Sequence, residues 1–84
     1  MYTVYVLYSE KYDKIYIGYT ANIEKRILSH NQLATKGWTI KFRPWKVVYT
    51  EEFKTKPEAM KREKELKSYQ GRKFIREQIL KGLE

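Results

Sequence analysis

The sequence predicts an α+β fold: a small three-stranded antiparallel sheet flanked by helices, in the order strand, strand, helix, strand, helix, helix. Three observations predict this class. Two aromatic and β-branched runs near the N-terminus are separated by a short polar segment. A third such run follows one helical segment and precedes two more. The 84 residues, 42% hydrophobic and 33% charged, are enough for one globular domain over residues 1–84 and too few for two.

The three strands are predicted from residue type. Residues 2–8 (YTVYVLY) and 46–52 (KVVYTEE) are rich in the β-branched and aromatic residues that favour strands. Residues 15–18 (IYIG) are typical of a further short strand. It is expected to pair with the first strand as an antiparallel hairpin over the polar turn at 9–14.

Alternation assigns the side chains of the first strand to two faces. Val4 and Val6 are expected on one face of the sheet, and Tyr5 and Leu7 on the other.

The first helix is expected over residues 23–31. Asn22 is a good N-cap, because its side-chain oxygen can accept from a free backbone N–H of the first turn. Ile23 and Ile27 lie one turn apart and are expected on the buried side.

The second helix has a defined start and runs to about residue 68. Thr55 followed by Glu58 is a capping box, and Pro57 stands in the first turn, where its missing N–H is not needed. The helical pattern breaks around Ser68. A third helix is expected over about 72–81, and its buried residues are expected to be Phe74, Ile75, Ile79 and Leu80.

Composition excludes several classes of site. The chain has no cysteine, which excludes disulfides and thiolate chemistry, and its one histidine excludes histidine-rich metal clusters. It contains neither a GxGxxG motif nor a P-loop, so a nucleotide cofactor is not expected. No signal-peptide pattern and no apolar run near the about 18 residues of a membrane span is present, so we expect a cytoplasmic protein.

The charge of the chain favours a polyanionic partner. Lys and Arg number 18 against 10 Asp and Glu, a net charge of +8 that is spread along the sequence. A basic folded surface suits nucleic acid. Simple solubility is the alternative explanation.

One acid interrupts an apolar stripe. Glu63 lies on the same helical face as Ala59 and Leu66. An unpaired buried carboxylate is unfavourable by several kcal/mol, so this group must meet a base, accept hydrogen bonds or bind a cation. An ion pair with a neighbouring Lys or Arg is the simpler of these alternatives.

Residues 32–45 have no clean period and interleave bases with aromatic rings. Bases could bind a phosphate backbone while a ring stacks on nucleobases. In the alternative interpretation, the tryptophans only cover the edge of the sheet. The candidate contact residues of this segment are Lys36, Trp38, Lys41 and Arg43.

The ordered motifs of the chain resemble those of the GIY-YIG nuclease superfamily over about residues 2–80. They are Thr3-Val4-Tyr5, then Tyr16-Ile17-Gly18 followed by Tyr19, then Arg26 and His30 on the first helix, and Glu63 on a later one. The chain is most similar to the small stand-alone bacterial members, which are similar to the nuclease domain of the bacterial excision-repair excinuclease. Thr-Val-Tyr replaces Gly-Ile-Tyr, and Tyr19 stands where some relatives have a lysine.

This resemblance implies hydrolysis of phosphodiester bonds in DNA with one Mg²⁺ or Mn²⁺ ion. Glu63 would hold the cation, and Arg26 would stabilise the transition state. Tyr5 would orient or activate the attacking water, and His30 could accept its proton. Tyr16 would hydrogen-bond the phosphate or help position that water.

The resemblance also implies substrate contacts near Gly18 and Tyr19, and a role in DNA repair or recombination. It is compatible with a homodimer or a larger repair complex. Two alternatives remain open at this point. One is a nucleic-acid-binding module of the same fold without useful catalytic activity, and the other is an interaction protein whose basic face binds an acidic partner.

Overall fold

The computed structural model describes residues 1–33 and 37–81 of the chain. Its three strands are β1 (Tyr2–Ser9), β2 (Lys14–Thr20) and β3 (Lys46–Phe53). They form one antiparallel sheet in the order β2-β1-β3, so the first strand of the sequence is the central one. The predicted sheet and hairpin are confirmed, and β2 extends beyond the predicted 15–18 at both ends.

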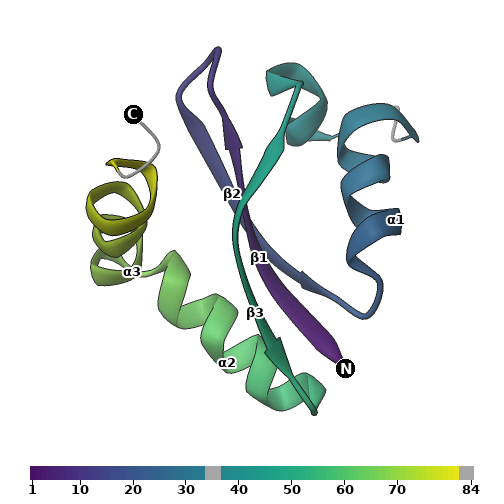
Figure 1. Cartoon of the computed structure of the whole chain (residues 1–84), viewed down its shortest axis with the longest axis vertical. Coiled ribbons are helices and arrows are strands. Elements are labelled where there is room, and N and C mark those ends of the chain that lie inside the picture. The colour runs from purple at the N-terminus through teal and green to yellow at the C-terminus, as the bar shows by residue number, and fades with distance from the viewer. Residues whose placement is uncertain (34–36, 82–84) are drawn as a thin grey trace.

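Helices cover both faces of the sheet (Figure 1). On one side lie α1 (Ile23–Leu28), which continues as the wider π-helical turn η1 (Ser29–Leu33), and the short 3-10 helix η2 (Trp38–Phe42). On the other side lie α2 (Lys56–Lys67) and α3 (Tyr69–Phe74), the latter continuing as the π-helical η3 (Ile75–Leu80). In the described part of the chain, no helix is long and apolar enough to cross a membrane.

The two faces of β1 belong to two separate cores, as the alternation predicts. Val4 and Val6 pack in a cluster with the buried residues of α2 and η3. Tyr5 and Leu7 pack on the opposite side with Trp45. All four of these β1 side chains are fully buried, and each such burial contributes about 1.5–3 kcal/mol.

Both predicted helix caps are present. The Asn22 side-chain oxygen accepts from the backbone N–H of Lys25 at 3.1 Å. The Thr55 hydroxyl oxygen accepts from the backbone N–H of Glu58 at 3.4 Å and donates to the Glu58 carboxylate at 2.8 Å. These local bonds fix where α1 and α2 begin.

The third helix begins earlier than the sequence pattern predicts. Ser68 ends α2 and also caps α3, since its hydroxyl oxygen accepts from the backbone N–H of Gly71 at 3.2 Å. The helix therefore starts at Tyr69 and not near 72.

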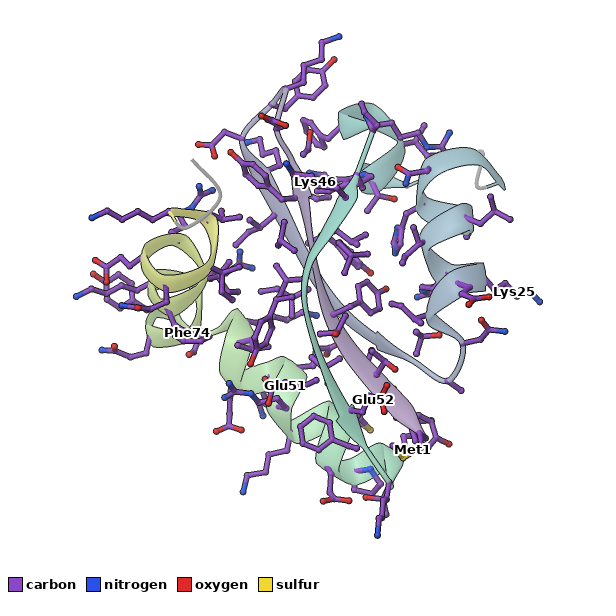
Figure 2. All side chains as sticks on the ribbon, viewed as in Figure 1. Met1, Lys25, Lys46, Glu51, Glu52 and Phe74 are labelled. Carbon is purple, nitrogen blue, oxygen red and sulfur yellow. The ribbon has the colours of Figure 1, made fainter. Side chains whose placement is uncertain are left out.

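The burial predicted for Phe74 is wrong. Its side chain is 37% exposed and lies at the outer surface of α3 (Figure 2), whereas Ile75 and Leu80 are buried and Ile79 is half-buried, as predicted. Ile75 and Ile79 are one turn apart and face the sheet together, which turns Phe74 toward the side. Its ring makes an edge contact with Tyr49, with centroids 6.1 Å apart.

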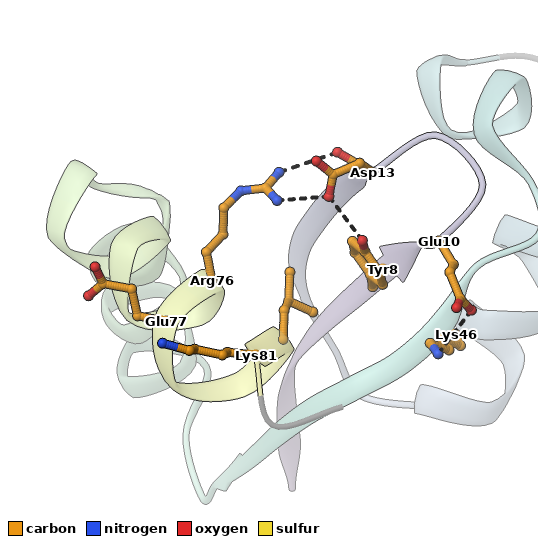
Figure 3. Close-up of a pocket in the computed structure, with 8 residues that line it drawn as sticks. Tyr8, Glu10, Asp13, Lys46, Arg76, Glu77 and Lys81 are labelled. Atoms are coloured by element: carbon orange, nitrogen blue, oxygen red, sulfur yellow. Dashed lines mark hydrogen bonds and ion pairs between the residues drawn. The ribbon is translucent and has the colours of Figure 1, made fainter. Parts of the chain in front are cut away.

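A hydrogen-bonded clamp ties the last helical segment to the first hairpin (Figure 3). The Arg76 guanidinium donates to the Asp13 carboxylate at 2.9 Å and to the Asp13 carbonyl at 3.3 Å. The Tyr8 hydroxyl donates to the same carboxylate at 2.9 Å. Hydrogen bonding to Arg76, then to Tyr8, lowers the pKa of Asp13. Asp13 has a φ of 52°, the left-handed backbone that a tight turn requires.

The corner between α2 and α3 predicts a severe effect at Gly71. A Cβ atom at this position would overlap the backbone of Glu65 and Leu66, which cannot move as a side chain would. Gly71→Ala is expected to lower the free energy of unfolding by about 2–3 kcal/mol in urea denaturation. Gln70→Ala, an exposed neighbour on the same helix, should change it by no more than about 0.5 kcal/mol. Equal effects of the two substitutions would contradict the close packing of this corner.

Candidate active site

The Tyr5 hydroxyl is the centre of a buried polar cluster. Tyr5 lies on β1 and is fully buried. The Arg26 Nε–H donates to its oxygen at 3.3 Å, and His30 Nε2 lies 3.1 Å from the same oxygen. The structure thus brings together three side chains that lie 21 and 25 residues apart in the sequence.

Helix α1 and its continuation η1 place both partners on one side, Arg26 on α1 and His30 on η1. Arg26 and His30 stand one turn apart, so their side chains project from the same stretch of helix. Ile23 and Ile27, the predicted apolar side, pack against the same cluster of Tyr5, Leu7 and Trp45. This packing holds α1 against the sheet and fixes the two polar side chains over the phenol.

Tyr16 and Gly18 bring β2 into the site. The Tyr16 ring lies 4.7 Å from the His30 ring and 6.2 Å from that of Tyr5, between centroids. Gly18 stands opposite Tyr5 in the sheet register. A Cβ atom on Gly18 would lie 2.7 Å from the Tyr5 hydroxyl oxygen, so glycine leaves the room that this phenol occupies.

The surroundings determine the charge of each group. Burial, opposed by the Arg26 hydrogen bond, raises the pKa of Tyr5 to about 12, with the Glu63 charge among the smaller causes. Burial, followed by the charges of Arg26 and Arg43, lowers the pKa of His30. The hydrogen bond with Tyr5 raises the pKa of Arg26. Near neutral pH the cluster therefore consists of a phenol, a neutral imidazole and a guanidinium.

The hydrogen bonds favour one tautomer of His30. Arg26 can only donate, so the buried Tyr5 hydroxyl must direct its own proton to another acceptor or lose a hydrogen bond. His30 Nε2 is that acceptor, which places the imidazole proton on Nδ1. Nδ1 lies 3.2 Å from the Thr39 hydroxyl oxygen, which then accepts. Thr39 is buried on η2 and is a member of the cluster that sequence reasoning missed.

Glu63 lies on α2, the helix that covers the other face of the sheet from α1. The predicted stripe is present, since Ala59 and Leu66 are buried while the Glu63 side chain is 21% exposed. Its carboxylate pairs with the Lys67 ammonium at 3.4 Å, one turn further along the helix. This is the simpler alternative that the sequence left open. Its charge is the last and smallest of the causes that act on the raised pKa of Tyr5.

The donor set near Glu63 fits one kind of cation. Within residues 1–33 and 37–81, no group of three or more His, Asp or Glu side chains could enclose a metal ion. Mg²⁺ does not require such a cage, because it keeps several waters and binds through one or two carboxylates plus substrate phosphates. Carboxylate and water oxygens also suit Mn²⁺. Glu63 fits as a single protein ligand of this kind.

Three of the predicted substrate contacts do not join the cluster. Tyr19 packs against the core on the opposite face of the sheet, with Val4 and Val6. Trp38 is 47% exposed, and Lys41 is exposed on the same short helix. Lys36 lies outside the described residues. Their assigned contacts stay predictions.

Arg43 is engaged in holding the site together. Its Nε donates to the His30 carbonyl at 2.6 Å and its Nη2 to the Ser29 carbonyl at 3.2 Å. Beside it, the Asn31 amide exchanges two hydrogen bonds with the backbone of Trp45, at 2.7 and 2.9 Å. These contacts anchor the end of the first helix to the loop before β3. The predicted phosphate contact of Arg43 stays untested, as does the role of each cluster residue.

His30 gives stability a defined pH dependence. Its folded-state pKa lies below the usual 6.5, so below about pH 6.5 the unfolded chain takes up a proton that the folded chain does not. From this group alone, the free energy of unfolding should fall by up to about 1.4 kcal/mol between pH 6.5 and 5.5. Urea denaturation of wild type and His30→Gln at pH 7.5 and 5.5 measures this change in the free energy of unfolding. The variant should show the flatter dependence, and an equally steep one would contradict the assignment.

The comparisons with known proteins agree with this geometry. A family model described as the GIY-YIG catalytic domain matches residues 1–75. The UPF0213 protein SH2523 of Staphylococcus haemolyticus is 43% identical over 74 residues, covering 88% of this chain and 84% of that protein. A UPF0213 protein of Staphylococcus saprophyticus is 44% identical over 62 residues, covering 74% and 76%.

A solved structure shares the fold. The solution NMR structure of the UPF0213 protein BH0048 from Bacillus halodurans has a TM-score of 0.53 and 31% sequence identity, and the match covers 89% of this chain and 82% of that one. The family match spans β1, β2, α1 and α2, the elements that carry the Tyr5 cluster and Glu63. The chain belongs to the GIY-YIG family, among its small UPF0213 members.

Proposed function

We propose that this protein is a divalent-metal-dependent endonuclease that hydrolyses phosphodiester bonds in DNA. The observation that carries the proposal is the fully buried Tyr5 hydroxyl held between the Arg26 guanidinium and the His30 imidazole. A buried phenol with a cation on one side and a neutral proton acceptor on the other is equipped to move a proton.

Tyr5 and His30 act together in activating water. With a pKa of about 12, the Tyr5 phenol is a poor base at neutral pH by itself. Its proton can pass to His30 Nε2 as its oxygen takes a proton from the attacking water, so the charge ends on an imidazolium. The Nδ1–H of His30 remains hydrogen-bonded to the Thr39 hydroxyl oxygen. The lowered pKa of His30 keeps the imidazole neutral, and so able to accept, before the reaction begins.

Arg26 supplies the fixed positive charge. Its Nε–H is used by Tyr5, which leaves the other N–H groups of its guanidinium for the phosphate oxygens. Because its geometry is set by the folded site, it stabilises the developing charge of the transition state without reorganisation. The Tyr16 hydroxyl, on the neighbouring strand, is assigned a contact to the same phosphate.

Glu63 is assigned the metal ion. A Mg²⁺ or Mn²⁺ ion bound there would supply Lewis-acid stabilisation of the phosphate and of the leaving oxygen. Glu63 would exchange the Lys67 ammonium, its partner at 3.4 Å, for this ion.

The net charge of +8 supports a nucleic-acid substrate, and the family resemblance supports DNA and a role in repair or recombination. One such cluster cuts one strand. A double-strand break would therefore take two copies of the chain or two successive events.

In the hydrogen-bond chain from Tyr5 through His30 to Thr39, Thr39 is a positioning residue. Its effect is measurable in two ways. Thr39→Val removes the acceptor for His30 Nδ1–H, so the imidazole should change from one tautomer to a mixture, as read by ¹⁵N NMR of the ring. The cleavage rate should fall about tenfold with little change in KM. Thr39→Ser keeps the hydroxyl and should restore both. A single Nδ1–H tautomer in the valine variant would refute this role.

The cleavage assay tests the proposed function directly. Wild type, Arg26→Ala and Glu63→Gln are incubated with labelled linear and branched DNAs in Mg²⁺, in Mn²⁺ and in EDTA. Wild type should cut only with metal, and each substitution should lower the rate by about 10²–10³-fold. Glu65→Gln, an exposed acid on the same helix, should cut as wild type does.

Circular dichroism of each variant shows whether it is folded, so that a lower cleavage rate can be distinguished from a loss of structure. If wild type binds these DNAs and cuts none of them, the enzyme proposal fails. The chain would then be a nucleic-acid-binding module of the same fold.

A further inference from the structure

A groove runs along the outer edge of the sheet, next to the Tyr5 cluster. It has a volume of about 430 Å³ and is floored by Lys14 to Ile17 of β2, which is an edge strand. Tyr16, a neighbour of Tyr5 and His30, is part of its lining. The groove therefore leads away from the candidate active site.

One wall of the groove is cationic. Lys67 of α2, Arg72 of α3 and Arg76 of η3 line it on one side, and Lys14 lies on the floor. Among the described residues, the one carboxylate of the lining is that of Asp13, and Arg76 takes it up in the clamp of Figure 3. This described lining therefore holds four cations and one carboxylate, and that carboxylate is already paired with Arg76.

Arg72 and Lys67 can exchange their present partners for a ligand in the groove. Arg72 Nε donates to the Lys67 carbonyl at 3.1 Å, which uses one of five guanidinium donors and holds the group at the helix junction. Lys67 pairs with Glu63 at 3.4 Å while about half of its side chain stays exposed. Both cations lie within the reach of a ligand in the groove.

An exposed aromatic ring faces these cations. Trp38 also lines the groove, and 47% of its surface is exposed. Its ring is held by Phe42 at 4.7 Å and by the buried Trp45 at 5.8 Å, between centroids. A large ring kept exposed and rigid by its neighbours is a suitable stacking platform for a nucleobase.

We propose that this groove binds the strand of nucleic acid beside the scissile phosphate. Its phosphates lie against Lys67 and Arg72, and one of its bases stacks on Trp38. This assignment rests on the proposed function. It adds the path along which the bound strand extends from the candidate active site.

Binding to the metal-free protein tests the groove without any cleavage. A fluorescein-labelled single-stranded oligonucleotide is titrated in EDTA at several salt concentrations. The double variant Lys67→Gln/Arg72→Gln is compared with Lys25→Gln/Lys54→Gln, which removes the same charge from exposed positions elsewhere, Lys25 pointing away from the sheet in Figure 2. The groove pair should bind at least about tenfold more weakly, with a salt slope reduced by about 1.4 for two lost phosphate contacts. The control pair should lose about twofold.

Trp38 gives a second measurement that does not depend on charge. Bound oligonucleotide should quench tryptophan fluorescence, because a stacked base contacts the exposed ring while Trp45 is buried. Trp38→Phe should abolish most of the quenching, and Trp38→Ala should weaken binding about fivefold or more. Equal losses in the groove and control pairs, or quenching that survives in Trp38→Phe, would overturn the proposal.

The two proposals fail separately. A wild type that cuts DNA while its groove variants bind and cut like the control pair would refute the groove and leave the endonuclease. A wild type that cuts nothing, with binding lost only in the groove variants, would support the groove and refute the endonuclease.

Discussion

The fold depends on satisfying one hydroxyl in the middle of the sheet. β1 is the central strand and is covered on both faces, so Tyr5 has no access to water. A buried hydroxyl without partners costs about 1–3 kcal/mol. Arg26 of α1 and His30 of η1, which lie on this face, remove that cost. Gly18 completes the arrangement by leaving space for the phenol on the neighbouring strand. The same contacts thus stabilise the domain and assemble the site.

Local signals made most of the fold predictable. Strand alternation assigned the β1 side chains to their faces, and Asn22 and Thr55 marked helix starts, because each rests on bonds within a few residues. The α2–α3 corner was harder. Ser68 ends one helix and caps the next. The sequence does not show that its hydroxyl caps α3, because this depends on the tight packing of Gly71 against α2. Because the start of the third helix was predicted too late, the burial of Phe74 was also predicted wrongly.

The site was predictable in its motif residues and not in its support. Ordered motifs named Tyr5, Tyr16, Arg26 and His30, which the structure brings together. Thr39 could not be foreseen, since it lies in a stretch without period and reaches His30 only through tertiary packing. The groove cations Lys67 and Arg72 come from helices on the other face of the sheet. The position of Tyr19, in contrast, follows from parity: it alternates with Gly18 and shares the face of Ile15 and Ile17.

The sheet register has a consequence for synthesis of the chain. The central strand pairs with a segment more than 40 residues later, Tyr2 standing opposite Phe53. A nascent chain holding only the first hairpin would expose Val4 and Val6, whose apolar partners arrive with α2 and η3. Two strands alone are marginal in water. The domain therefore closes late, when α2 and η3 become available to cover this face of the sheet. A polypeptide with this topology therefore completes its candidate site only at the end of translation.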